Sequence, residues 1–404
     1  MTAGTLRELW QERGRLGPAF ATAIGVGCLP LLVLPWTYGA LVTRAGYSAS
    51  QAGWIATLEV GALATTALLA AGRATRPGRR SLAAAGTLLT IVANAIAIVV
   101  APGSALFLMA RVCSGTGLGV AVAVGNAAAA GSPNPTRAFA VLWFLMALWQ
   151  LIIFNLTPLV IAHLGLPGAY GLIAGVCLAF LPLILRTPDP GAVGPDVESS
   201  AKKGAVRGVL AVATLAAFLA FWLRDALVFS MSERLAADLG IDGQRLGVIL
   251  GVASVLGLLG PALAARLGAG EPPRGLLVAS LLLALGASAV MALGMSPLAF
   301  GGATLLLPAT GLFAASLLSG FAADIDKTGR LVAIGAGIGF VSEAIGPAIG
   351  GTLMEAGGRG MLFVAVIVIG AISIAAVAAA ARLERASRGH ADPTTVAPGV
   401  GQTQ

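Results

Sequence analysis

The chain has 404 residues, of which 57% are hydrophobic and 10% are charged, and its net charge is +8. A soluble domain carries about 25% charged residues and a disordered chain is poor in apolar residues, so the composition excludes both and predicts a membrane protein. In such a protein a basic balance indicates loop arginines that fix orientation, and we expect no nucleic-acid partner.

Apolar stretches recur along the chain, and a helix needs about 20 apolar residues to cross the hydrocarbon layer. We predict twelve spanning helices. In the first half they are Pro18–Val42, Gln51–Ala71, Ser81–Ala101, Ala105–Ala130, Ala138–Ala162 and Ala169–Leu185. In the second half they are Gly208–Met231, Leu246–Ala265, Gly275–Met295, Leu298–Ala323, Leu331–Met354 and Met361–Ala381. The first stretch is longer than the core of a cleaved signal peptide, so we expect it to be retained.

A polar segment divides the helices into two sets of six. We expect an N-terminal bundle over residues 1–186, a cytoplasmic linker over 187–207, a C-terminal bundle over 208–382 and a flexible tail over 383–404. An offset of 194 residues pairs Arg80 with Arg274 and pairs Thr116-Gly117-Leu118 with Thr310-Gly311-Leu312. Six helices per repeat give both halves the same orientation, so the predicted fold is an all-α membrane protein of two parallel six-helix repeats.

Lysine and arginine are unevenly distributed between the two sets of loops. With the N-terminus inside, the inner segments hold 19 of the 25 basic residues, the outer loops hold 4, and 2 lie within helices. Cytoplasmic loops carry an excess of basic residues. We therefore expect a multi-pass protein of the cell (inner) membrane with both termini in the cytoplasm.

The loop after the second helix is basic and rich in glycine. It resembles the loop signature GxxxDRxGRR of the major facilitator superfamily, with matches at Arg76, Gly78, Arg79 and Arg80. The leading glycine of the signature is Ala71 here and its aspartate is Thr75, so the resemblance does not predict the charge relay of that aspartate. The alternative is a short basic turn that follows the bias of inner loops.

Two helices carry further signatures of that family. Arg111 to Gly117 resembles RxxxGxG in the fourth helix, and Gly346, Pro347, Gly350 and Gly351 resemble GPxxGG in the eleventh. Exporters of the family typically carry GPxxGG on the fifth helix, where this chain has Asn155-Leu156-Thr157-Pro158, so the direction of transport stays open. The resemblance implies gating by the loop and by GPxxGG, and alternating access around a central cavity.

Five ionisable residues lie inside the predicted helices: Glu59, Arg111, Arg224, Asp225 and Glu343. Each unpaired charge costs about 2.5–3.5 kcal/mol in the bilayer centre, so we expect pairing or water around them. Three acids and two bases allow two pairs and leave one acid as a proton carrier. Alternatively, Arg224 and Asp225 mark an early outer end of their helix, and Glu59 and Glu343 are structural partners of the arginines.

These features predict a secondary transporter for a small organic solute, drug-like or a weak acid, in which the five charges couple protons to transport. We expect a monomer in the lipid bilayer, with no cofactor and no metal. The alternatives are an uncoupled facilitator, a lipid-translocating protein or a transport-inactive sensor. An enzyme is not expected, because the sequence has no HExxH, GxSxG or GxxxxGK[ST] motif. Just beyond the seventh helix, Glu233 and Arg234 are expected on a solvated outer rim.

Overall fold

The computed structural model describes residues 16–132, 135–189, 208–267, 274–325 and 330–389. Residues 1–15, most of the predicted linker and the end of the predicted tail lie outside these ranges. Throughout the described ranges the regular elements are helices. This confirms the all-α prediction.

The helices follow one another closely along the chain. The first half contains η1 (Ala21–Val26), α2 (Leu29–Thr43), α3 (Ala49–Ala74), α4 (Arg79–Val99), α5 (Ala105–Ala130) and α6 (Pro135–Ile184). The second half contains α7 (Gly208–Ser230), α8 (Ser232–Ala237), α9 (Gly243–Gly257), α10 (Leu259–Leu267), α11 (Arg274–Leu293), α12 (Pro297–Ile325) and α13 (Arg330–Gly389). Within the described ranges, 10 helical stretches are long and apolar enough to cross a membrane. A multi-pass membrane protein is therefore confirmed.

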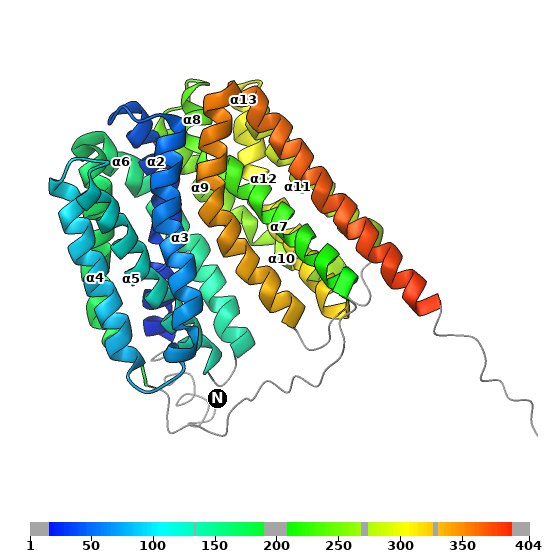
Figure 1. Cartoon of the computed structure of the whole chain (residues 1–404), viewed down its shortest axis with the longest axis horizontal. Helices are drawn as coiled ribbons and strands as arrows, with labels where there is room; N and C mark the ends of the chain where they lie inside the picture. Colours follow the sequence, from blue (N-terminus) through cyan, green and yellow to red (C-terminus); the bar gives the residue numbers. More distant parts are fainter. Residues whose placement is uncertain (1–15, 133–134, 190–207, 268–273, 326–329, 390–404) are drawn as a thin grey trace, which may run out of the picture.

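The helices α6 and α13 are each longer than a membrane is thick. Each consists of two helical segments joined by a break at glycine. In α6 the break is at Gly165, where φ is 65° and ψ is −161°. In α13 it is at Gly357 and Gly358, and Gly358 has a φ of 60°. Glycine adopts such positive φ values without the steric penalty of a β-carbon. Figure 1 shows α13 (orange to red) reaching one end of the molecule and turning back there.

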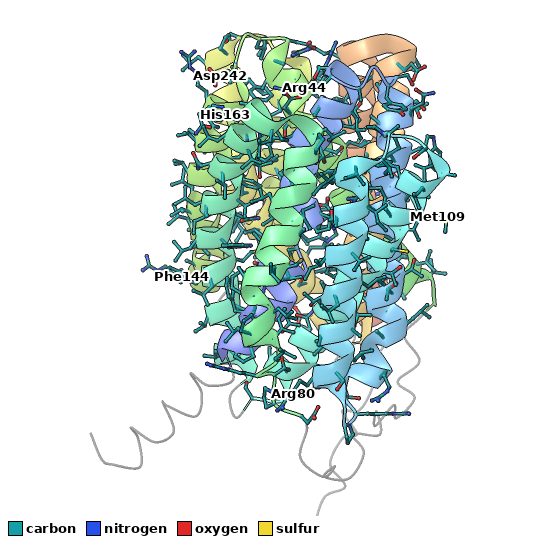
Figure 2. All side chains as sticks on the ribbon, turned by 90° about the vertical axis from the view of Figure 1, so that its left-hand side faces the viewer. Arg44, Arg80, Met109, Phe144, His163 and Asp242 are labelled. Carbon is teal, nitrogen blue, oxygen red and sulfur yellow. The ribbon has the colours of Figure 1, made fainter. Side chains whose placement is uncertain are left out.

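The bundle has two distinct ends. Figure 2 shows Arg80 at one end, and Arg44, His163 and Asp242 at the opposite end. We call the end with Arg80 the loop end and the other the far end. On the flanks the side chains of Met109 and Phe144, which are 63% and 52% exposed, project away from the helices. Such exposed apolar flanks suit contact with lipid.

Glycines let α5 pack closely on its two neighbours in the first half. A β-carbon on Gly115 would collide with the backbone carbonyl of Glu59 in α3, and one on Gly117 would collide with the carbonyl of Gly86 in α4. Small residues at helix crossings allow this approach in membranes. The crossing brings the start of α5, with Arg111, directly beside the middle of α3.

The two halves meet on the far-end side of the molecule. Gly53 in α3 lies against the carbonyl of Pro347 in α13, and Gly351 lies against the carbonyl of Ala49. The backbone N–H of Ala348 donates a hydrogen bond of 3.2 Å to Oγ1 of Thr57. From this contact the ribbons of α3 and the first part of α13 diverge toward the loop end (Figure 1).

Candidate functional site

Arg111 and Glu59 form a buried ion pair between α5 and α3. Nη1 of Arg111 lies 3.1 Å from Oε1 of Glu59, and the two side chains are 1% and 12% exposed. Nη2 of Arg111 donates to Oδ1 of Asn94 in α4 at 3.1 Å, and the hydroxyl of Ser114 donates to Oε1 of Glu59 at 2.8 Å. A buried pair needs such additional hydrogen bonds to offset the loss of water.

Two aromatic rings contact the guanidinium group of Arg111. The guanidinium carbon of Arg111 lies 4.0 Å from the ring centre of Tyr170 and 5.5 Å from that of Phe107. A cation over an aromatic face is attracted by the quadrupole of the ring. Nε of Arg111 is buried without a hydrogen-bond partner in the described residues. The arginine is thus fixed in orientation while one of its donors is unused.

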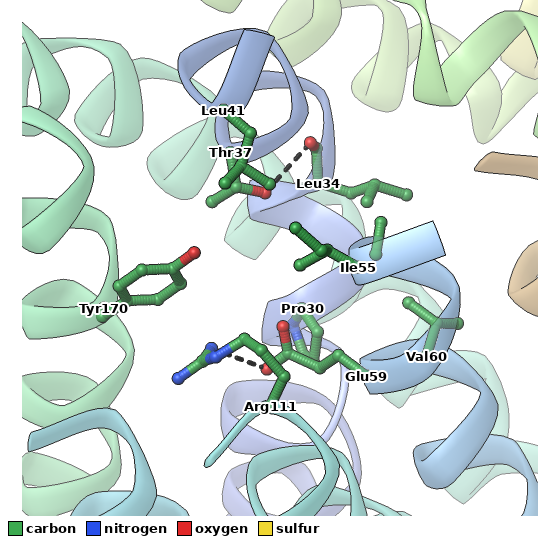
Figure 3. Close-up of a pocket in the computed structure, with 10 residues that line it drawn as sticks. Pro30, Leu34, Thr37, Leu41, Ile55, Glu59, Val60, Arg111 and Tyr170 are labelled. Carbon is green, nitrogen blue, oxygen red and sulfur yellow. Dashed lines mark hydrogen bonds and ion pairs between the residues drawn. The ribbon is translucent and has the colours of Figure 1, made fainter. Parts of the chain in front are cut away.

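The pair lines a small pocket in the first half (Figure 3). The pocket lies between α2, α3, α5 and α6 and is narrow, with a cavity volume of about 10 Å³, which is room for about one water molecule. Its wall is largely apolar, with polar groups from four side chains: Thr37, Glu59, Arg111 and Tyr170. An apolar pocket with a few convergent polar groups is the usual form of a small-molecule site, and in this conformation the pocket is closed down to about the size of one water molecule.

A second charged group lies in the other half. Nη2 of Arg224 is 2.6 Å from Oδ1 of Asp225, its neighbour on α7, and the arginine is 1% exposed. The hydroxyl of Ser288 in α11 donates to the same Oδ1 at 3.3 Å. The ring of Phe221 lies 4.9 Å from the guanidinium carbon. Because Arg224 is buried, the alternative that it extends to water at a helix end is wrong for this structure.

Glu343 is the remaining acid and lies on α13. It is half-buried and makes no hydrogen bond or ion pair with any described residue. It is close enough to Asp225 for the two carboxylates to repel each other when both are ionised. The five predicted charges therefore form two separate groups, with Glu59 and Arg111 in one half and the other three in the second half.

The predicted gating residues occupy two places. In the loop, the backbone N–H groups of Gly78 and Arg80 donate to Oδ1 of Asp189 at 3.2 and 3.3 Å. Nε of Arg79 donates to the carbonyl of Pro188 at 2.6 Å, and Arg76 is exposed. The loop thus binds the segment that follows α6.

The other four predicted gating residues lie on α13, where it contacts neighbouring helices. Gly346 packs on Ala226 of α7, and Gly350 packs on Met231, which directly follows α7. Pro347 and Gly351 contact α3 of the first half. This segment therefore joins the second half internally and also joins the two halves to each other.

The fold and these contacts are those of an all-helical, multi-pass membrane protein. The sequence matches the Major Facilitator Superfamily over residues 18–325, and the chain belongs to this family. This is a family of transporters and not of enzymes. The matched range includes the loop and Arg111 and ends before α13.

Among solved structures, the chain is similar to a crystal structure of the nucleoside transporter NupG, determined as a point mutant. The TM-score is 0.68 with 12% sequence identity, over 92% of this chain and 99% of that chain. At this identity the likeness shows the fold. No curated protein sequence matches the chain.

Proposed function

We propose that the chain is a secondary active transporter that moves a small organic solute by alternating access and couples this movement to protons. The observation that carries the proposal is the Arg111–Glu59 pair in the wall of an apolar pocket. When Glu59 binds a proton, Arg111 loses its counter-ion and becomes available to an anionic group of the solute. A proton and a weak acid would then favour the same state of the site.

The proposed architecture has twelve spans, because α6 and α13 each count as two on either side of their glycine breaks. The N-terminal bundle covers residues 1–186 and the C-terminal bundle covers 208–382, joined by the linker. We place the loop end in the cytoplasm of the cell and the far end outside, since the basic residues concentrate in the segments of the loop end. The transporter is proposed to work as a monomer.

The arrangement of the halves supports one conformational state of the transport cycle. The halves touch near the far end through α3 and α13, and their ribbons diverge toward the loop end (Figure 1). We take this arrangement to be a state in which the far end is closed to the outside. In the opposite state, the contacts of Pro347 and Gly351 with α3 would open.

Coupling is tested by flux into proteoliposomes after a solute has been found. The purified protein is first screened for thermal stabilisation between pH 5.5 and 8.5 against weak acids, nucleosides and drug-like amines. For a stabilising solute, a proton gradient should drive uptake against the concentration gradient in the wild type. Glu59→Gln should abolish this uptake and retain solute exchange, and Glu343→Gln should do the same.

The alternatives give different results in the same assay. An uncoupled facilitator would show flux that is insensitive to collapse of the gradient, and both variants would then behave as the wild type. A lipid-translocating protein would move labelled lipid between leaflets with no flux of the soluble panel. A sensor would bind a solute without moving it.

A further inference from the structure

Glu233 joins the two halves at the far end. It lies on α8, and its carboxyl packs against Gly39 in α2, where a β-carbon would collide with Oε2. That oxygen is buried and has no hydrogen-bond partner in the described part of the chain. Glu233 is therefore half-buried between the halves, with one carboxyl oxygen out of contact with water, and does not lie on a fully solvated rim. A carboxyl oxygen in this position is stable only when the group is neutral or when a cation compensates it.

The neighbouring cations are engaged with other groups. Nη1 of Arg44, just beyond α2, donates to the carbonyl of Ile161 at 2.8 Å. On α8 itself, Nε of Arg234 lies 3.5 Å from Oδ1 of Asp238, and the other oxygen of Asp238 is 3.2 Å from Nε of Arg359 in α13. Both nearby arginines act on Glu233 through space without an ion pair.

The other elements around α8 bring no further cation to the carboxyl. At the start of α9, Arg245 is paired with Asp242 at 3.2 Å. On α7, Arg224 is paired with Asp225, and on α2 the hydroxyl of Tyr38 donates to the carbonyl of Ala49. The part of α11 near α8 contains no ionisable residue between Gly275 and Leu293.

Burial raises the pKa of Glu233 from 4.5 to about 7, although Arg234 and Arg44 lower it. When the far end opens, water reaches the carboxyl and its pKa returns toward the ordinary value of 4.5. The closed arrangement then binds the proton more tightly than the open one. Closing is favoured as the pH falls below 7, and opening is favoured as the pH rises. The equilibrium constant between the closed and open forms changes by about 300-fold at most across the pH range between the two pKa values.

We propose that Glu233 is a proton-binding site that controls the far-end gate. The neutral carboxyl packs on Gly39 and holds the two halves together, whereas the carboxylate must reach water and separates them. This rests on the proposed function in one respect, because it takes the far-end contact to be a gate of the transport cycle. It adds a third proton site, apart from Glu59 and Glu343, that acts on conformation and does not touch the pocket.

The gate is tested by spin-label distances in the full-length protein in lipid nanodiscs without solute. Labels are placed on Ala45→Cys in the first half and Leu298→Cys in the second, both exposed near the far end, after the native cysteines are replaced by alanine. The ratio of open to closed populations should rise at least tenfold from pH 5 to pH 9. A ratio that does not change with pH would overturn the proposal.

Two variants identify the residue responsible. Glu233→Gln carries a permanently neutral group, so it should stay closed with less than a twofold change over the same range. Gly39→Ala forces the carboxyl out of its place and should favour the open form at every pH. A full pH response in Glu233→Gln would contradict the role of this carboxyl, and a closed Gly39→Ala would contradict the packing.

Glu355→Gln is the matched control. The carboxylate of Glu355 also crosses between the halves, where Oε2 accepts hydrogen bonds from the hydroxyl of Ser48 at 2.9 Å and the N–H of Ser50 at 3.1 Å, but it is exposed. Its substitution should shift the populations without removing the pH response. Because no solute is present, this result is independent of the flux assay. A pH-controlled gate without proton-driven uptake would contradict only the proposed function.

Discussion

Arg111 shows how an apolar helix accommodates a cation. Its guanidinium has one acid, one amide and two aromatic rings as neighbours. The sequence identifies the arginine because a charge in the hydrocarbon layer is costly. It does not identify Asn94 or Ser114, because single polar residues in membrane helices are common and their rotational position depends on how α4 and α5 pack.

Asn94 is predicted to stabilise the buried cation. In Asn94→Leu the guanidinium loses an acceptor that it cannot replace with water, which should reduce the free energy of unfolding by about 1–3 kcal/mol. Thermal unfolding in detergent, with Thr87→Val as the control on the same helix, measures the difference. Among the described residues, Thr87 bonds only to the carbonyl of Ala83 in its own helix. Equal effects of the two substitutions would contradict the prediction.

Tyr170 is predicted to act through its ring. Its hydroxyl has no hydrogen bond to the described residues, whereas its ring lies 4.0 Å from the guanidinium carbon of Arg111. Tyr170→Phe should therefore unfold near the wild-type temperature. Tyr170→Leu should be less stable than Tyr170→Phe by about 1 kcal/mol or more. The same unfolding assay compares the two, and a greater loss in Tyr170→Phe would show that the hydroxyl is the important group.

At the scale of elements, the ends of some helices follow closely from local sequence. The predicted span Ala105–Ala130 coincides with α5, because the side chain of Ser104 accepts a hydrogen bond from the N–H of Phe107 and caps the helix. The predicted span Leu246–Ala265 is divided into α9 and α10 near Leu258. Hydropathy does not predict this division, since both parts are apolar.

The short helix α8 was not predicted. It carries Glu233, the residue whose observed surroundings differ most from those expected from the sequence. Glu233 follows the seventh helix closely, so a local interpretation places it in water. Its burial depends on α2 of the other half, and contacts between distant segments do not follow from hydropathy.

The crossing of α3 and α5 predicts a contrast between two glycines. Gly115→Ala introduces a β-carbon that collides with the carbonyl of Glu59, so the free energy of unfolding should fall by about 1–3 kcal/mol. Gly61→Ala on α3 has nothing within 4 Å and should stabilise the helix by up to about 1 kcal/mol. Unfolding in detergent measures both. If Gly115→Ala left the free energy of unfolding unchanged, the prediction would be wrong, and the two helices would be able to move apart at little cost.

At the scale of the whole molecule, the contact between the halves predicts a change of conformation without loss of folding. Gly351→Ala collides with the carbonyl of Ala49 in the other half, so it disfavours the arrangement with the far end closed. Maleimide labelling at Thr57→Cys, beside Ala348, should become several times faster. Gly360→Ala, which has open space around it, is the control and should leave the rate unchanged. A rate that stays at the wild-type value in Gly351→Ala would contradict this prediction.

The bond between the loop and Asp189 has a consequence for biosynthesis. Gly78 is the N-cap of α4 and has no side chain with which to cap it, so the acceptor comes from a residue 111 positions later. At about 5–20 residues per second, translation of that interval takes roughly 6–22 s. The first turn of α4 therefore lacks this protein acceptor until the end of α6 has been synthesised. The N-terminal half reaches its final form only when its last helix has entered the membrane.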